Sequence, residues 1–188
     1  MSGNVNADFN TRKLATMGIM AALSVVLVFF IHIPIFPAAP FLEYDPADIP
    51  ILIVTFAYGP LSGFIITVIA AAVQGFTVSA QSGVYGILMH IVSTGSFILT
   101  AGIIYRIRHN RLGAGIGLIC GVLVNAAVMA PANLIITPIF MGAPVETVRA
   151  MLFPVIIPFN LIRSGINGAV TFFLYKIISN LIKGRSGN

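Results

Sequence analysis

Long apolar stretches separated by short polar connections occupy almost the whole chain, and this pattern restricts the folds open to it. Hydrophobic residues make up 58% of the 188 residues and charged residues only 8%, with a mean hydropathy of +1.02. Soluble domains carry about 25% charged residues. Because a membrane-spanning helix needs about 20 apolar residues, there is room for five or six crossings. We therefore expect an all-α integral membrane protein with a single membrane domain over residues 1–188.

The apolar runs differ in length. They cover residues 14–31, 49–58, 61–77, 85–105, 116–136 and 151–182. The second run is only about 15 Å long as a helix, which is short for a crossing, and Gly59-Pro60 separates it from the third. The first run is too long for a signal-peptide core and lacks a clear cleavage site, so we expect it to be retained as a span.

Charged residues decide whether residues 49–77 cross once or twice. Two crossings put every basic cluster on one side: Arg12, Lys13, Arg106, Arg108, Arg111, Lys183 and Arg185. Four of the five acids then fall on the other side: Glu43, Asp45, Asp48 and Glu146. The positive-inside rule makes the basic side cytoplasmic. We therefore predict six transmembrane helices with a short second helix, both termini cytoplasmic, a cytoplasmic segment at 1–12, and external loops at 34–48 and 137–150.

An arginine lies inside the last apolar run. Asn160 and Asn167 are one turn before and after Arg163, so all three side chains share one helical face. A buried cation in hydrocarbon costs several kcal/mol, which favours a polar site facing the protein interior. The alternative, if the helix begins only after Pro158, is that Arg163 snorkels to the membrane surface. Pro158 removes a helical hydrogen bond nearby and is expected to interrupt the helix. This face is the first candidate for a binding pocket.

Other polar residues extend the candidate site and leave alternatives open. Asn133 either contacts a ligand or caps a break at Pro131. His90 either lines the pocket or makes an interhelical hydrogen bond. In the first external loop, Asp48 is expected to cap the short helix. Glu43 has no such structural role, and neither has its neighbour Tyr44, so this loop is a candidate lid.

Several functions are disfavoured by what the sequence lacks. It has no P-loop for ATP, its three histidines are not spaced as a metal site, and we find no catalytic cluster. We also find no carboxylate within the apolar runs, which argues against an ion-coupled secondary transporter. The net charge of +5 comes from residues at span ends, so it reflects topology and not nucleic-acid binding. We therefore expect no enzyme activity, no metal and no resident cofactor.

Four motifs carry a resemblance to a known family. They are residues 42–50 (LEYDPADIP), 56–60 (FAYGP), 131–135 (PANLI) and 157–163 (IPFNLIR). In this order and spacing the chain resembles the riboflavin-specific substrate-binding S subunits of energy-coupling factor (ECF) vitamin transporters. The resemblance extends from the first span onward, with the 157–163 motif as its most specific part. One departure is Arg163, where the family commonly has lysine, and the arginine fork presents a different donor geometry.

The resemblance implies a function, a site and partners. A multi-pass S subunit in a prokaryotic plasma membrane would capture riboflavin outside, and a transmembrane coupling subunit and two cytoplasmic ATPases would drive its delivery inward. Its implied ligand-binding residues are Leu42, Glu43, Tyr44, Gly86, His90, Asn133, Asn160 and Arg163. Asn167 is included with them because it shares the helical face of Asn160 and Arg163. An S subunit for another vitamin, such as thiamine or biotin, remains an alternative.

The first span carries a stripe of small residues. Ala15, Gly18 and Ala22 share one helical face, and Gly18 and Ala22 form a small-xxx-small pair. The pattern fits either packing within the chain or contact with a partner. The resemblance favours the partner, since S subunits use an alanine-rich face of the first helix to bind the coupling subunit.

Overall fold

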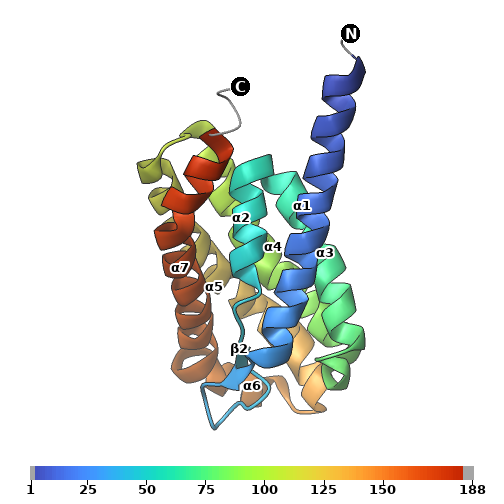
Figure 1. The fold of residues 1–188 in the computed structure, drawn as a ribbon. Coiled ribbons are helices and arrows are strands. Elements are labelled where there is room, and N and C mark those ends of the chain that lie inside the picture. Colours follow the sequence, from blue (N-terminus) through green and yellow to red (C-terminus); the bar gives the residue numbers. More distant parts are fainter. Residues whose placement is uncertain (1–2, 184–188) are drawn as a thin grey trace.

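The computed structural model describes the backbone of residues 3–183 and the side chains of residues 11–174, and this part is almost entirely helical (Figure 1). In chain order the elements are α1 Gly3–Phe30, β1 Ile33–Pro34, β2 Glu43–Tyr44, α2 Asp48–Tyr58, α3 Pro60–Phe76, the 3-10 turn η1 Ala80–Ser82, α4 Gly83–Ile107, α5 Arg111–Met141, α6 Val145–Met151, the π-helical segment η2 Leu152–Ile156 and α7 Ile157–Lys183. The expected all-α class is therefore correct, with one short antiparallel hairpin added in the first long connection.

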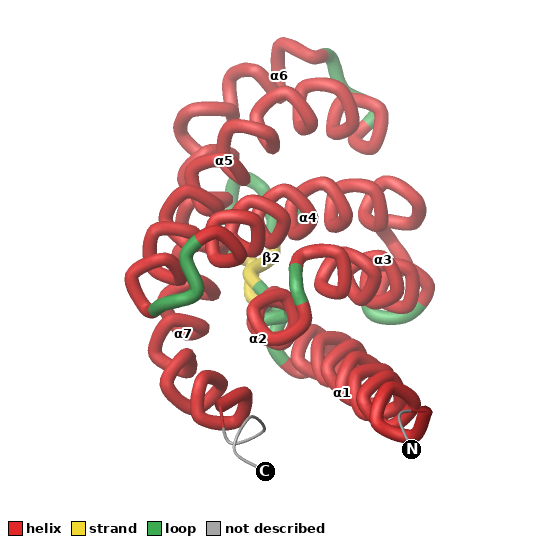
Figure 2. Tube along the Cα trace, turned by 90° about the horizontal axis from the view of Figure 1, so that it is seen from above, coloured by secondary structure: helices red, strands yellow, loops and turns green. Residues whose placement is uncertain are grey.

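The predicted short second helix lies at the centre of the bundle. Helix α2 contacts α1, α3, α4 and α7, which surround it when the bundle is seen from above (Figure 2). Ile51, Leu52 and Val54 are fully buried. A helix that is apolar on all sides has to be covered on all sides, so the composition of α2 accounts for its position. The break after it is also as predicted, because Gly59 has a φ of +93° and Pro60 opens α3.

Helices α4 and α5 pack closely along a line of small residues. A Cβ atom built on Gly117 would lie 2.7 Å from the carbonyl oxygen of Ala101, and one on Gly121 would lie 2.6 Å from the ring of Phe97. Phe97 itself is fully buried in the main hydrophobic cluster. Glycine is therefore required here because the two backbones approach too closely for a side chain.

The helices sort into long and short apolar segments. Within the described residues, four are long and apolar enough to cross a membrane: Thr11–Phe30, Ala80–Ile107, Arg111–Met141 and Val145–Leu174. Helices α2 and α3 are apolar but shorter. The start of α1, the α4–α5 connection and the end of α7 lie at one end of the bundle, and the hairpin and α6 lie at the other (Figure 1).

One expectation about helix boundaries is wrong. Residues 137–150 are not a loop, because α5 continues through Pro138 to Met141 and α6 begins at Val145, leaving a short turn at the left-handed Gly142. Proline is tolerated inside membrane helices where neighbouring groups satisfy the freed backbone, so Pro138 did not mark the end. The interruption expected near Pro158 is present, because the π-helical segment η2 ends directly before α7 begins at Ile157.

Candidate ligand-binding site

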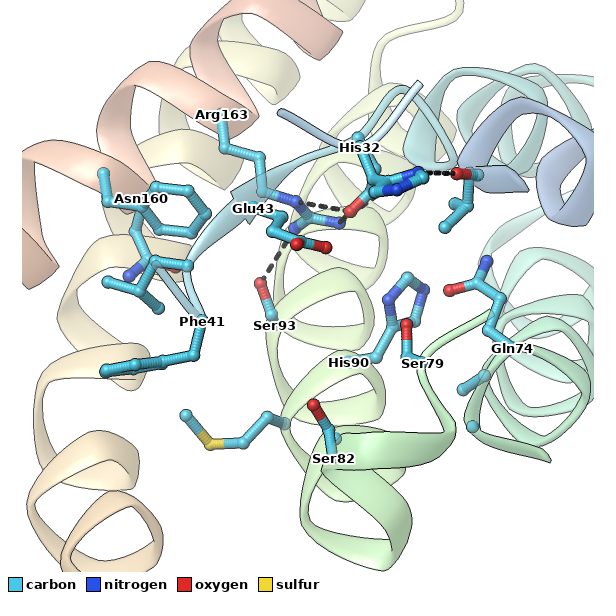
Figure 3. A pocket seen from close by; sticks show the side chains of 18 of the residues that line it. His32, Phe41, Glu43, Gln74, Ser79, Ser82, His90, Ser93, Asn160 and Arg163 are labelled. Carbon is cyan, nitrogen blue, oxygen red and sulfur yellow. Dashed lines mark hydrogen bonds and ion pairs between the residues drawn. The ribbon is translucent and has the colours of Figure 1, made fainter. Parts of the chain in front are cut away.

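A cavity of about 170 Å³ lies at the hairpin end of the bundle, between the connection after α1 and helices α3, α4, α5 and α7 (Figure 3). Residues from three separate segments that were predicted to bind a ligand line it. They are Leu42, Glu43, Gly86, His90, Asn160 and Arg163. The fold therefore brings together most of the site that the sequence indicated.

The buried cation at position 163 is paired with two carboxylates. Arg163 is 5% exposed, and its Nη2 lies 3.2 Å from an oxygen of Asp45 and 3.2 Å from one of Asp48. Its Nε also donates to Asp45, at 3.3 Å, and its Nη1 donates to the hydroxyl of Ser93, at 3.2 Å. The charge is thus compensated inside the protein, and the guanidinium ties the first connection and α2 to α7.

Asp48 has a different role from the predicted one. Ala47 is the residue that precedes α2, and no side chain caps the helix there. The Asp48 carboxylate is fully buried and accepts hydrogen bonds from Thr94, at 2.6 Å, and from Asn167, at 3.0 Å, besides Arg163. Asp48 precedes the apolar run 49–58 by one residue, so a carboxylate is buried at the start of α2 although none lies within the runs themselves. A buried arginine needs a buried counter-charge, and this requirement could have identified Asp48 as a partner of Arg163 from the sequence.

Tyr44 and Asn167 lie beside the cavity and do not line it. The Tyr44 hydroxyl donates to Oδ1 of Asn167 at 3.2 Å, and Nδ2 of Asn167 donates to the backbone oxygen of Asp45 at 2.9 Å. Burial and the neighbouring Asp45 carboxylate raise the pKa of the Tyr44 phenol above its ordinary value, so the donor proton stays in place at neutral pH. These two predicted ligand contacts instead fasten the hairpin to α7.

His90 lies on the cavity wall provided by α4. Its Nε2 lies 3.4 Å from the hydroxyl of Thr94, one turn along the same helix, so the alternative of an interhelical hydrogen bond is not what the ring makes here. Thr94 gives its proton to Asp48, so Nε2 is the donor in this contact. In the neutral ring the other nitrogen, Nδ1, is then an acceptor.

Asn133 on α5 and Asn160 on α7 differ in how many of their hydrogen-bonding atoms remain available to a ligand. Asn160 is buried on the cavity wall, and its Nδ2 donates to the carbonyl of Ile156 at 2.8 Å, so Oδ1 can accept from a ligand. Asn133 uses both ends of its amide within α5, donating to Met129 and accepting from Thr137. Asn133 therefore has less capacity for a ligand, and its helix-stabilising alternative gains support.

Asn133 also lines a second, smaller space. This cavity of about 90 Å³ lies beside the first and shares five lining residues with it: Phe41, Leu42, Ser82, Gly86 and Met89. Phe41 and Leu42 belong to the first connection, so that segment partly divides one space from the other.

Comparisons with known proteins identify the family. Residues 12–175 match the profile described as ECF transporter, substrate-specific component. The chain belongs to this family. As a substrate-specific component it is the part of a transporter that binds the substrate.

Individual relatives cover nearly the whole chain. The Riboflavin transporter RibU of Staphylococcus aureus (strain TCH60) is 26% identical over 178 residues, which are 92% of this chain and 93% of the relative. The Riboflavin transporter FmnP of Bacillus subtilis (strain 168) is 27% identical over 175 residues, which are 88% of this chain and 90% of the relative. A solved structure described as "Structure and mechanism of the S component of a bacterial ECF transporter" superimposes with a TM-score of 0.80 at 29% identity and covers 93% of this chain and 99% of that one.

Sequence reasoning missed several residues of this substrate-specific component. Asp45 and Ser93 hold Arg163, and Phe41 and Phe159 add aromatic surface to the cavity. Their partners are distant in the chain, with Asp45 and Arg163 118 positions apart, so no local pattern signals the contact. Among the side chains that the structure describes, no cluster of three or more His, Cys, Asp or Glu residues could hold a metal ion.

Proposed function

We propose that this substrate-specific component binds riboflavin outside the cell and delivers it inward together with a coupling subunit and ATP-hydrolysing partners. The observation that carries the proposal is a cavity with aromatic and thioether surface beside a buried arginine and an amide. An isoalloxazine ring is a broad apolar plane with a mixed donor and acceptor edge, and such a lining complements it. The relatives named riboflavin transporters support the same ligand. Proteins of this kind act in the prokaryotic plasma membrane without being enzymes themselves.

The proposed ligand contacts follow from the cavity lining. We assign direct contact to Leu42, Glu43, Gly86, His90, Asn160 and Arg163. Asn133 would reach the ligand only from the adjoining cavity, and Tyr44 and Asn167 would act through the hairpin that they hold. A volume of about 170 Å³ is below the 300–1,000 Å³ that is typical of ligand pockets. The connection at 34–48 would therefore shift to admit riboflavin, as a lid does.

A titration tests this function directly. The protein purified in detergent should quench riboflavin fluorescence with one-to-one stoichiometry, and its lack of tryptophan keeps the protein signal low. Thiamine or biotin should not displace the flavin. Binding of one of those vitamins in place of riboflavin would identify an S subunit of different specificity. Uptake by the chain alone, driven by a proton gradient without ATP, would favour the secondary-transporter alternative, for which Asp48 supplies a buried carboxylate.

We further propose six crossings with both termini in the cytoplasm. The start of α1, the end of α7 and the basic α4–α5 connection share one end of the bundle, which supports an even number of crossings (Figure 1). Under this proposal residues 1–12 are cytoplasmic, and the 34–48 connection and the 137–150 region are external within one membrane domain of residues 1–188.

Cysteine labelling checks the topology. Cys120 is the only cysteine, so Cys120→Ala gives a clean background. A single cysteine at the exposed position Glu146 should react with a membrane-impermeant maleimide in intact cells. A single cysteine at the exposed position His109 should react only after the cells are permeabilised, because the positive-inside rule puts that end in the cytoplasm. The reverse pattern at either position would contradict the proposed orientation.

The small-residue stripe of α1 is proposed as the contact with the coupling subunit. Ala15, Gly18 and Ala22 are all exposed, whereas Met17 and Ala21 on the neighbouring face of the helix are buried. A Cβ atom on Gly18 would meet nothing within 4 Å. This face is therefore free of packing within the chain and allows a partner helix to approach closely.

A substitution on this stripe separates assembly from ligand binding. Gly18→Leu should reduce co-purification with the coupling subunit by about tenfold or more, because a leucine prevents close helix approach. Riboflavin affinity should stay within about twofold, since the stripe is exposed and far from the cavity lining. Gly165→Leu is the matched control, because Gly165 on α7 also has open space around it. Equal losses of assembly in both variants would remove the special role of α1.

A further inference from the structure

The two sides of the cavity differ in chemistry. Phe41, Phe159 and Met129 line it toward α5 and α7. On the opposite side, toward α1 and α3, the lining includes the polar side chains of His32, Gln74, Ser79 and His90, beside Val28 and Ala71. Figure 3 shows this division, with Phe41 and Asn160 on one side of Arg163 and Glu43, and the polar group on the other. A bound molecule would therefore meet apolar surface at one end and hydrogen-bonding groups at the other.

Gln74 is the most unusual member of the polar side. It is 4% exposed, and its Nε2 has no hydrogen-bond partner although the atom is buried. Burying an amide without a partner is costly, and such groups are rare in folded proteins. The side chain points from α3 toward the cavity that it lines, near His90 and Ser79 (Figure 3). Nε2 of Gln74 is thus a buried hydrogen-bond donor without an acceptor among the described residues.

Hydrogen bonds to backbone carbonyls hold two neighbours of Gln74, Ser79 and His32, in place beside it. The backbone amide of Ser79 donates to the carbonyl oxygen of Gln74 at 2.9 Å, so the two residues are held together where α3 ends. His32 donates from Nδ1 to the carbonyl of Val28 at 3.0 Å, which makes Nε2 the acceptor in the neutral ring. An amide, a hydroxyl and an imidazole acceptor together match a group that both donates and accepts, as an alcohol does.

We propose that Gln74, with Ser79 and His32, forms a subsite for the hydroxylated chain of the ligand. The fused ring then lies at the aromatic side, between Phe41 and Phe159. This inference rests on the proposed function, because the ligand that joins an apolar ring to a polyol is riboflavin. Gln74 is accordingly a specificity-determining residue that distinguishes flavins with the hydroxylated chain from those without it.

The test uses two flavins and one substitution in the full-length protein. Gln74→Leu keeps the side-chain volume and removes the amide, so riboflavin affinity should fall about tenfold or more. Lumiflavin has the same ring with a methyl group in place of the ribityl chain. Its affinity for Gln74→Leu, measured by displacement of a bound flavin, should stay within about threefold of its affinity for the unsubstituted protein. The thermal midpoint without ligand should not fall, because the amide makes no hydrogen bond that the substitution could break. Gln81→Leu, the same change at an exposed position, is the matched control and should alter neither affinity.

Each other outcome overturns the inference in a distinct way. Unchanged riboflavin affinity in Gln74→Leu would show that Gln74 does not contact the ligand. Equal losses for both flavins would assign the contact to the ring, and a lowered thermal midpoint without ligand would make Gln74 a packing residue. If the parent protein bound no riboflavin at all, the proposed function would fail first, so the two failures are distinguishable.

Discussion

Arg163→Ala is expected to lower the free energy of unfolding by about 3–5 kcal/mol and to weaken riboflavin binding at least about tenfold. The substitution leaves the fully buried Asp48 carboxylate without its cation, and removing one partner of a buried ion pair is costly for this reason. It also releases Asp45, and with it the connection that carries Leu42 and Glu43 to the cavity. Equilibrium unfolding in mixed micelles and flavin titration measure the two effects.

A second substitution separates the charge from the packing. Adding Asp48→Asn to Arg163→Ala removes the uncompensated carboxylate, so the double variant should recover part of the lost stability while its riboflavin binding stays weak. Arg163→Lys should lose less than Arg163→Ala, because the charge remains and only the planar fork that spans Asp45, Asp48 and Ser93 is lost. Wild-type stability and binding in a monodisperse Arg163→Ala protein would exclude both the ion-pair role and the ligand contact.

Gly117→Leu is expected to destabilise the bundle by about 1–3 kcal/mol or more, to the point of poor expression. Even a Cβ atom at this position would lie 2.7 Å from the backbone oxygen of Ala101, which cannot rotate away as a side chain could. The α4–α5 contact would have to open along its length, and α4 carries both His90 and Ser93. Loss of stability should therefore be accompanied by weaker flavin binding.

The matched control for this prediction is another glycine. Gly165→Leu on α7 introduces the same side chain where nothing lies within 4 Å of the added Cβ atom. Gly165 borders an apolar groove between α5 and α7, so the leucine has space and its effect on stability should stay within about 0.5 kcal/mol. Similar thermal midpoints for the two variants would contradict the argument from close approach of α4 and α5.

The elements themselves were largely predictable, because their signals are local. Apolar runs determined the helices, and Gly59-Pro60 separated α2 from α3 as expected. The position of α2 at the centre also agrees with its uniformly apolar composition. Prolines were less consistent, since Pro138 lies inside α5 whereas Pro158 closely follows the interruption in η2. In a membrane helix the consequence of a proline depends on what neighbouring groups supply to the backbone.

The sequence by itself favoured a polar site around Arg163, because a cation within an apolar run is costly unless it meets an interior partner or snorkels to the membrane surface. Only the tertiary structure decided which residues meet that requirement. Asp45 and Asp48 come from a segment more than a hundred residues away, and they reach Arg163 because α2 packs against α7. The unpartnered amide of Gln74 was likewise invisible in the sequence, since whether a polar group is satisfied depends on atoms that only the folded chain brings near it.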